Sequence, residues 1–271
     1  MATFLHTFVP DPIIVSLGPL SIYWYGLFAG IGLTLAWLVI EKLQKRYGIK
    51  EDLFPLFIGT VIAGLLGARI YHVLNEFAFY IDHPLLIVQI WNGGLALHGG
   101  IAGAVLYGYY WVRRHNLPFP RILDIFVTGG ILVQIFGRFG NYFNQELFGS
   151  PTRASWGIPI SEAFRPQGYE NFLYFHPTFL YEALLNIVLF LFLLILHRGV
   201  LSGTIKLRKG YIFLFYLLFY SVIRIVMELL RIDATPILFG VRLPIIVSSI
   251  AIIVIVLFFI KDYVYKKENF S

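Results

Sequence analysis

The densest run of polar side chains in this sequence lies between residues 137 and 149. Within nine of these residues stand one arginine, two asparagines, a glutamine and a glutamate. Three glycines, Gly137, Gly140 and Gly149, let the backbone bend sharply or come close to a ligand. A cation beside several amide groups suits the binding of an anion. A plain loop at a membrane surface is the alternative interpretation.

A second polar set follows one face of a predicted helix. Tyr220, Arg224, Glu228 and Arg231 are spaced 4, 4 and 3 residues apart, which places them on one helical face. One interpretation is an Arg–Glu pair that neutralises itself between helices. The other is that one arginine is left over to hold an anion, because a planar guanidinium binds phosphate through two parallel hydrogen bonds.

Three further polar residues lie within apolar runs. His98 stands between two glycine pairs, and a histidine can transfer protons near neutral pH. A purely structural histidine is the alternative. Arg69 and Tyr25 are the other two, and ionisable groups inside a membrane span are usually functional. With no other histidine or carboxylate at zinc-ligand spacing near His98, and no nucleotide-binding motif, we expect neither a metal nor a cofactor.

The elements that must position these residues are long apolar helices. The 271-residue chain is 58% hydrophobic and 13% charged, against about 25% charged in soluble domains. A helix that crosses a bilayer needs roughly 20 apolar residues. The sequence therefore predicts an all-α, polytopic membrane protein, a single domain over 1–271 with about seven transmembrane helices. The expected spans are 21–40, 54–75, 94–112, 122–137, 178–196, 211–230 and 243–260.

Lysine and arginine are unevenly distributed between the two sets of loops. Fourteen lie in 41–52, 113–121, 197–210 and the C-terminal tail, and five lie in the loops of the opposite side. Cytoplasmic loops carry the excess of positive charge. We therefore expect the N-terminus outside, the C-terminus in the cytoplasm, and the long 138–177 segment facing out.

This orientation brings the unusual residues together in one layer near the outer face. The residues in this layer are Tyr25, Arg69, His98, Arg138, Asn141, Arg224 and Glu228. The chain has no cysteine, so any thiol in its chemistry must come from a substrate. The net charge of +6 follows the loop pattern, and no nucleic-acid partner is expected. The first lysine or arginine is Lys42, which predicts a first span that is retained rather than cleaved as a signal peptide.

These motifs, in this order, resemble the bacterial phosphatidylglycerol–prolipoprotein diacylglyceryl transferases. Residues 137–149 are similar to that family's signature, G-R-x-G-N-F-x-N-x-E-x-x-G. The other similar pieces are Trp24-Tyr25-Gly26, Gly67-Ala68-Arg69-Ile70, Asn92-Gly93-Gly94, His98-Gly99-Gly100, His176-Pro177-Thr178, Leu180-Tyr181-Glu182, and Tyr220 with Arg224, Glu228 and Arg231. Two places differ: Val241-Arg242-Leu243-Pro244 replaces a family motif ending in Gln, and 150–177 is compact.

The resemblance implies a reaction and its partners. The diacylglyceryl group of phosphatidylglycerol would move to the lipobox cysteine thiol of a prolipoprotein, forming a thioether and releasing glycerol phosphate, the first step of lipoprotein modification. The expected partners are phosphatidylglycerol, the prolipoprotein signal peptide with its lipobox cysteine, and membrane lipids. The expected location is the bacterial plasma (inner) membrane, as a multi-pass protein with its active site toward the outer leaflet.

The resemblance also suggests roles for individual residues. The expected catalytic residues are His98, Tyr25, Arg138 and Arg224. The expected phosphatidylglycerol-binding residues are Arg138, Asn141, Arg224, Tyr220 and Arg69. The expected structural or orienting residues are Glu146, Gly149, Glu228 and Arg231. His98 is the candidate base, with Tyr25 as the alternative, and Glu146 and Glu228 are expected to orient the two phosphate-binding arginines.

Two other classes of protein are alternatives. A lipid or anion transporter also uses intramembrane arginine, but it predicts polar residues at the midplane and on both sides. A membrane scaffold has no need for the dense polar segment at 137–149.

Overall fold

The computed structural model describes residues 2–18 and 20–270, and most of these are helical. The chain divides into two compact units. Unit 1 comprises the residues up to Leu38 and those from Phe126 onward, and unit 2 comprises Val39–Ile125.

Six helices among the described residues are long and apolar enough to cross a membrane. They are α2 (Trp24–Arg46), α3 (Phe54–Asn75), α6 (Phe119–Phe143), α7 (Thr178–Leu201), α8 (Tyr211–Leu230) and the Leu243–Tyr265 part of α9 (Leu243–Phe270). The protein is therefore a multi-pass membrane protein. These six correspond to six of the seven spans expected from the sequence.

The seventh expected span, 94–112, corresponds to α5 (Leu97–Arg114), which is not among the six. The helix is only 18 residues long, contains four glycines, and ends in Arg113 and Arg114. These features lower its hydropathy relative to the other helices. The count of seven spans and the orientation of the termini stay predictions.

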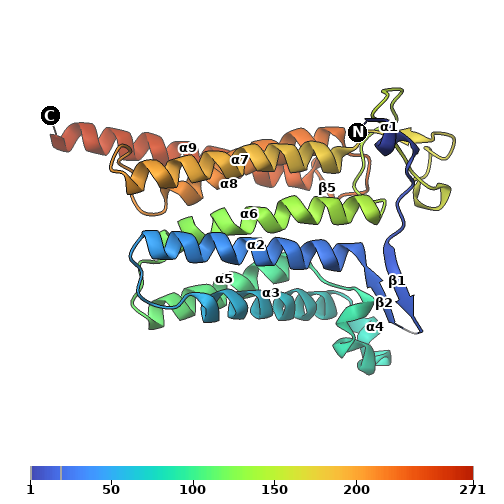
Figure 1. Ribbon diagram of the computed structural model, residues 1–271, viewed down its shortest axis with the longest axis horizontal. Coiled ribbons are helices and arrows are strands. Elements are labelled where there is room, and N and C mark those ends of the chain that lie inside the picture. Colours follow the sequence, from blue (N-terminus) through green and yellow to red (C-terminus); the bar gives the residue numbers. More distant parts are fainter. Residues whose placement is uncertain (1, 19, 271) are drawn as a thin grey trace. The chain divides into compact units, whose positions relative to one another are not determined.

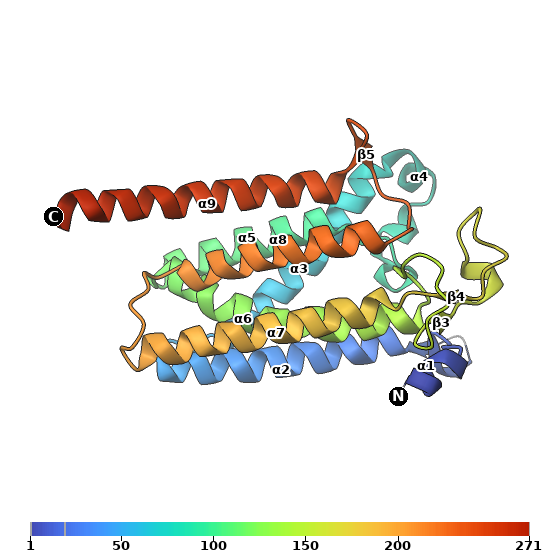
Figure 2. The same ribbon diagram turned by 90° about the horizontal axis from the view of Figure 1, so that it is seen from above.

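The core of unit 1 lies between α6, α7 and α8. Ile131 of α6 packs with Leu189 and Leu193 of α7 and with Ile223 and Met227 of α8, all of them buried. Leu189 and Leu193 stand four residues apart, and so do Ile223 and Met227, so each pair lies on one helical face. These two faces pack with Ile131 of α6 and hold the three helices against one another, and Figures 1 and 2 show the course of the three helices.

One end of unit 1 carries short elements. They are α1 (Ala2–Thr7), the hairpin of β1 (Ile13–Leu17) and β2 (Leu20–Tyr23), the hairpin of β3 (Ile158–Pro159) and β4 (Tyr174–Phe175), the 3₁₀ turn η3 (Glu162–Phe164), and the hairpin of β5 (Ile237–Leu238) and β6 (Val241–Arg242). The segment between α6 and α7 has a small core of its own, in which Phe148, Ile158, Ile160 and Phe175 are buried. This core gives the polar 137–149 segment a rigid support.

Unit 2 is built on very close contact between α3 and α5. A Cβ added at Gly67 would lie 2.4 Å from the carbonyl oxygen of Gly99, and one at Gly103 would lie 2.3 Å from that of Ala63. Small residues of this kind let two membrane helices approach with their backbones in contact. Along the chain, α3 is followed by α4 (Phe77–Asp82) and the 3₁₀ turns η1 (Pro84–Val88) and η2 (Ile90–Asn92), which lead to α5.

Candidate active site

Glu182 lies at the centre of a buried ion cluster in unit 1. Its carboxylate is fully buried near the start of α7 and is shared by two arginines. Arg138, near the end of α6, places Nη2 2.7 Å from Oε1, and Arg231, just after α8, donates from Nη2 to Oε2 at 2.6 Å. Burial lowers the pKa of Arg231, and the charge of Glu182 opposes that shift. One carboxylate thus holds the ends of three helices together.

Glu228 forms the second half of the cluster in the same way. It is 1% exposed on the last turn of α8, and Arg224, one turn earlier, lies 2.8 Å from its Oε2. Arg242, from β6, donates from Nε to Oε1 of Glu228 at 2.7 Å. Arg242 also donates to the backbone carbonyls of Arg231 and Asp233, at 3.0 and 2.9 Å. The turn that precedes α9 is therefore fixed to the end of α8.

The cluster holds more positive than negative charge at its buried centre. Four guanidinium groups surround two fully buried carboxylates, and Asp233 and Glu146 lie at the more exposed margin. Solvent screens charges at the margin more than buried ones. Among the contacts of the described residues, Arg224 is paired with Glu228 alone, and its side chain is 21% exposed. Arg224 thus retains guanidinium N–H groups that can bind an anion.

The signature segment extends the cluster through Asn141. This asparagine is buried, accepts a hydrogen bond from Nη1 of Arg138 at 2.9 Å, and donates to Oε1 of Glu146 at 2.8 Å. Glu146 also accepts from Asn144 at 3.2 Å. Glu146 contacts the two asparagines, and through Asn141 it is linked to Arg138. Glu182 lies directly beside Arg138, and Glu228 lies beside Arg224. The orienting roles of Glu146 and Glu228 stay predictions.

Two signature glycines are required by close packing. Gly149 donates its N–H to the carbonyl of His176 at 2.9 Å, and a Cβ there would lie 2.9 Å from side-chain atoms of both His176 and Thr178. A Cβ at Gly140 would lie 2.5 Å from the ring of Tyr25. Tyr25, half-exposed at the second position of α2, therefore lies against the signature segment.

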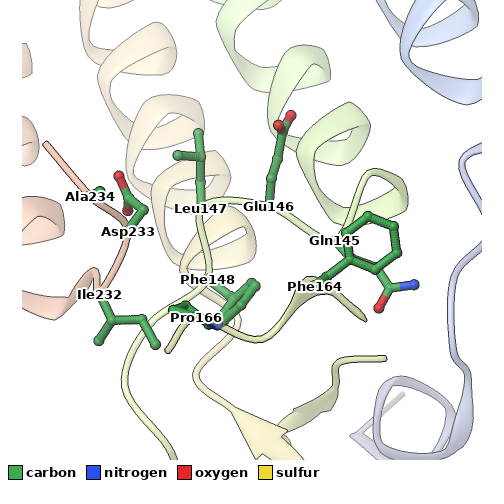
Figure 3. A pocket seen from close by; sticks show the side chains of 9 residues that line it. All are labelled: Gln145, Glu146, Leu147, Phe148, Phe164, Pro166, Ile232, Asp233 and Ala234. Carbon is green, nitrogen blue, oxygen red and sulfur yellow. The ribbon is translucent and has the colours of Figure 1, made fainter. Parts of the chain in front are cut away.

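A pocket of about 310 Å³ adjoins the signature segment. Figure 3 shows Phe148, Phe164 and Pro166 along one side and Ile232, Asp233 and Ala234 of the loop after α8 along another. Glu146 and Asp233 are its two carboxylates. The pocket thus opens a largely apolar space beside two acidic residues at the margin of the cluster.

Arg69, in unit 2, has a different environment from the one expected of a lipid ligand. The side chain is 7% exposed, and it donates to the carbonyls of Ile87, Gly93 and Gly94 at 2.8–3.0 Å and to that of Leu86. The backbone at Gly93 and Gly94 has φ values of 85° and 71°, which favour glycine. Four of the five guanidinium N–H groups thus fix the segment that leads into α5.

His98 is the second residue of α5, and its side chain is exposed. Its ring lies 6.3 Å from that of Tyr71, measured between centroids. Two features hold the start of α5 in place: the carbonyls bound by Arg69, and the contact of Gly67 with Gly99. The proton-transfer role of His98 stays a prediction.

Sequence reasoning missed two members of the cluster. Glu182 stands inside a predicted span, and a carboxylate at such a position is itself a functional signal. Arg242 lies just before the last span, at one of the places where the sequence differs from the family pattern. Its contact with Glu228 depends on the β5–β6 turn, which places Arg242 beside the end of α8.

Comparison with known proteins identifies the family. The model of the prolipoprotein diacylglyceryl transferase family matches residues 12–261. The chain belongs to this family. It is 39% identical over 232 residues to the phosphatidylglycerol–prolipoprotein diacylglyceryl transferase of Trichormus variabilis, covering 85% of this chain and 82% of that one. The corresponding proteins of Halalkalibacterium halodurans and Synechocystis are 35% and 37% identical, over 90% and 83% of this chain and 83% and 80% of theirs.

The matched range includes the whole ion cluster. Arg138, Glu182, Arg224, Glu228 and Arg242 all lie between residues 12 and 261. The cluster therefore lies within the part of the chain that matches the family model.

Proposed function

We propose that this protein transfers the diacylglyceryl group of phosphatidylglycerol to the lipobox cysteine of prolipoproteins, with the buried arginine cluster as its reaction centre. The observation that carries the assignment to this site is the pair of shared carboxylates, Glu182 and Glu228. Each is held by two arginines, which leaves positive charge for a phosphodiester. The family membership supports the reaction itself.

The reaction forms one bond and breaks another at the same carbon. The cysteine sulfur attacks carbon 3 of the glyceryl group, the bond from that carbon to the phosphate oxygen breaks, and glycerol phosphate leaves. The thiol proton passes to a base. Negative charge grows on the departing phosphate, so fixed cations at that position lower the barrier most effectively.

The arginines divide this work according to their contacts. Arg224 and Arg138 hold the phosphate, since their side chains are 21% and 16% exposed, and Arg231, at 1%, has a structural role. One amide N–H of Asn141 is bound to Glu146, and the other donates to the phosphate. Tyr220 lies one turn before Arg224 on α8. Arg69 positions the 84–94 segment rather than touching lipid, because its donors already serve four carbonyls.

His98 remains the proposed base and Tyr25 the alternative. The support for His98 is its chemistry and its exposed ring. The support for Tyr25 is its contact with Gly140 in the signature segment. General-base assistance is worth about 10²–10⁴-fold in rate. If the His98→Ala protein retains the full rate of diacylglyceryl transfer, the role of base passes to Tyr25.

The proposal places the protein in the bacterial plasma (inner) membrane with the cluster toward the outer leaflet. The distribution of lysine and arginine supports this orientation. The cluster joins the end of α6, the start of α7 and the end of α8, all at one end of unit 1 (Figure 1). A site near the outer surface admits an outer-leaflet lipid and an exported peptide from the same side.

The test uses purified protein, vesicles of phosphatidylglycerol and a peptide with a lipobox cysteine. Mass spectrometry should detect a diacylglyceryl adduct on the peptide, which a Cys→Ser peptide does not acquire. Absence of the adduct with folded protein would refute the proposed reaction. Lipid movement across the vesicles under those conditions would establish the transporter alternative instead.

A further inference from the structure

A second polar layer lies one helical turn from the ion cluster, between the same three helices. Gln134 precedes Arg138 by four residues on α6, and Asn186 follows Glu182 by four residues on α7. Tyr216 and Tyr220 precede Arg224 by eight and four residues on α8. Residues four apart share a helical face, so each member faces the same way as its neighbour in the cluster.

The register of α6 against α7 brings Gln134 and Asn186 to the same level. The two helices run antiparallel, because Arg138 meets Glu182 near one end and Thr128 lies 3.0 Å from His197 near the other. One step of four residues inward from the Arg138–Glu182 pair reaches Gln134 on α6 and Asn186 on α7. Gln134 in turn donates from Nε2 to the hydroxyl of Tyr216 at 2.7 Å.

This layer contains buried polar atoms that the described residues leave without hydrogen-bond partners. They are the carbonyl oxygen of Gln134 and both polar atoms of Asn186, whose side chain is fully buried. Unpaired polar groups in an apolar interior are costly, so each normally has a partner. For Asn186, either orientation of the amide presents one unpaired carbonyl and one unpaired NH₂ group, so its requirement does not depend on that assignment, and Gln134 is assigned with its NH₂ group toward Tyr216.

The chemistry of these atoms selects the type of partner. Two carbonyl oxygens need a donor, and the Asn186 NH₂ group needs an acceptor. Phosphate and ester oxygens only accept, and an ammonium group only donates and would meet the excess positive charge of the cluster. Hydroxyl groups both donate and accept. The layer is thus complementary to a neutral polyol lying next to the bound phosphate.

We infer that Gln134, Asn186 and Tyr216 bind the glycerol headgroup of the lipid and select phosphatidylglycerol over other phospholipids. This inference rests on the proposed function. One helical turn, about 5.4 Å, separates Gln134 from Arg138 on α6 and Asn186 from Glu182 on α7, and a three-carbon headgroup spans a similar distance from a phosphate at Arg138. Gln134, Tyr216 and Tyr220 are partly buried, whereas the side chain of Asn186 is fully buried.

The experiment compares two lipids with identical acyl chains, phosphatidylglycerol and phosphatidylpropanol, which lacks both headgroup hydroxyls. Transfer to a lipobox peptide is measured for the unaltered protein, Asn186→Leu and the milder Tyr216→Phe. Asn75→Leu, at an exposed position on α3, is the matched control. The readout is the ratio of kcat/KM for the two lipids. The folded fraction of each preparation cancels in this ratio.

The unaltered protein and Asn75→Leu should favour phosphatidylglycerol about tenfold to a hundredfold, as expected for hydrogen bonds at a buried site. Asn186→Leu and Tyr216→Phe should lose most of that preference. Equal rates on both lipids with the unaltered protein, or variants that lower both rates in proportion, would show that the layer holds only water or has a structural role. No transfer from either lipid by the unaltered protein would instead refute the proposed function.

Discussion

Replacement of Glu182 by glutamine tests the ion cluster most severely. The substitution keeps the shape of the side chain but removes a fully buried negative charge that lies 2.7 Å from Arg138 and 2.6 Å from Arg231. Removing one partner of a buried ion pair costs about 3–5 kcal/mol, because the other charge stays buried and unpaired. For a chain of this size that corresponds to a fall in unfolding temperature on the order of 10 °C.

The matched control is Glu41→Gln, the same substitution in an exposed pair. Glu41 is paired with Lys45 one turn later on α2, and their side chains are 36% and 70% exposed. Such a pair contributes about 0.3–0.5 kcal/mol. The assay is the loss of monodisperse protein on size exclusion after heating in detergent. Equal shifts for Glu182→Gln and Glu41→Gln would refute the reasoning that the cluster is buried and tightly paired.

Three further substitutions address the packing and charge around the site. Gly140→Ala should push the Tyr25 ring away and lower transfer about tenfold to a hundredfold, whereas Gly130→Ala, with open space at its Cβ, should keep the normal rate. Gly67→Ala should destabilise the protein by about 1–3 kcal/mol through overpacking, and Gly30→Ala should leave it as stable or more so. The Arg242→Met substitution leaves Arg224 as the arginine that pairs with Glu228, so the KM for phosphatidylglycerol should rise about tenfold, equivalent to ~1.4 kcal/mol. An unchanged KM would contradict the assignment of Arg242 to Glu228 and of Arg224 to the phosphate.

The sequence predicted where the long helices lie, whereas the number of helices that cross the membrane stays a prediction. Six long apolar runs agree with six helices that can span a membrane, because hydrophobic length is a property of the local sequence. The seventh run, α5, depends on backbone contact with α3 through Gly67 and Gly99. Such contacts let a shorter and less apolar helix form, and hydropathy alone does not predict them.

The candidate site was predictable where local spacing decides the contact. Arg224 and Glu228 stand four residues apart on one helix, and their pairing follows from that spacing. The partners of Arg138 and Glu228 from other helices, Glu182 and Arg242, depend on how distant segments meet. The same limit applies to Arg69, whose residue type suits a phosphate but whose donors are directed to the carbonyls of a loop.

The most direct test of the central claim is the rate of diacylglyceryl transfer from phosphatidylglycerol by Arg224→Ala, measured beside Arg224→Lys and the exposed control Arg153→Ala. If Arg224 stabilises the departing phosphate, Arg224→Ala should lower kcat/KM about 10²–10³-fold. Arg224→Lys should recover part of the rate, and Arg153→Ala should match the unaltered protein. An Arg224→Ala protein that is folded and transfers at the normal rate would contradict the assignment of the buried arginine cluster as the reaction centre.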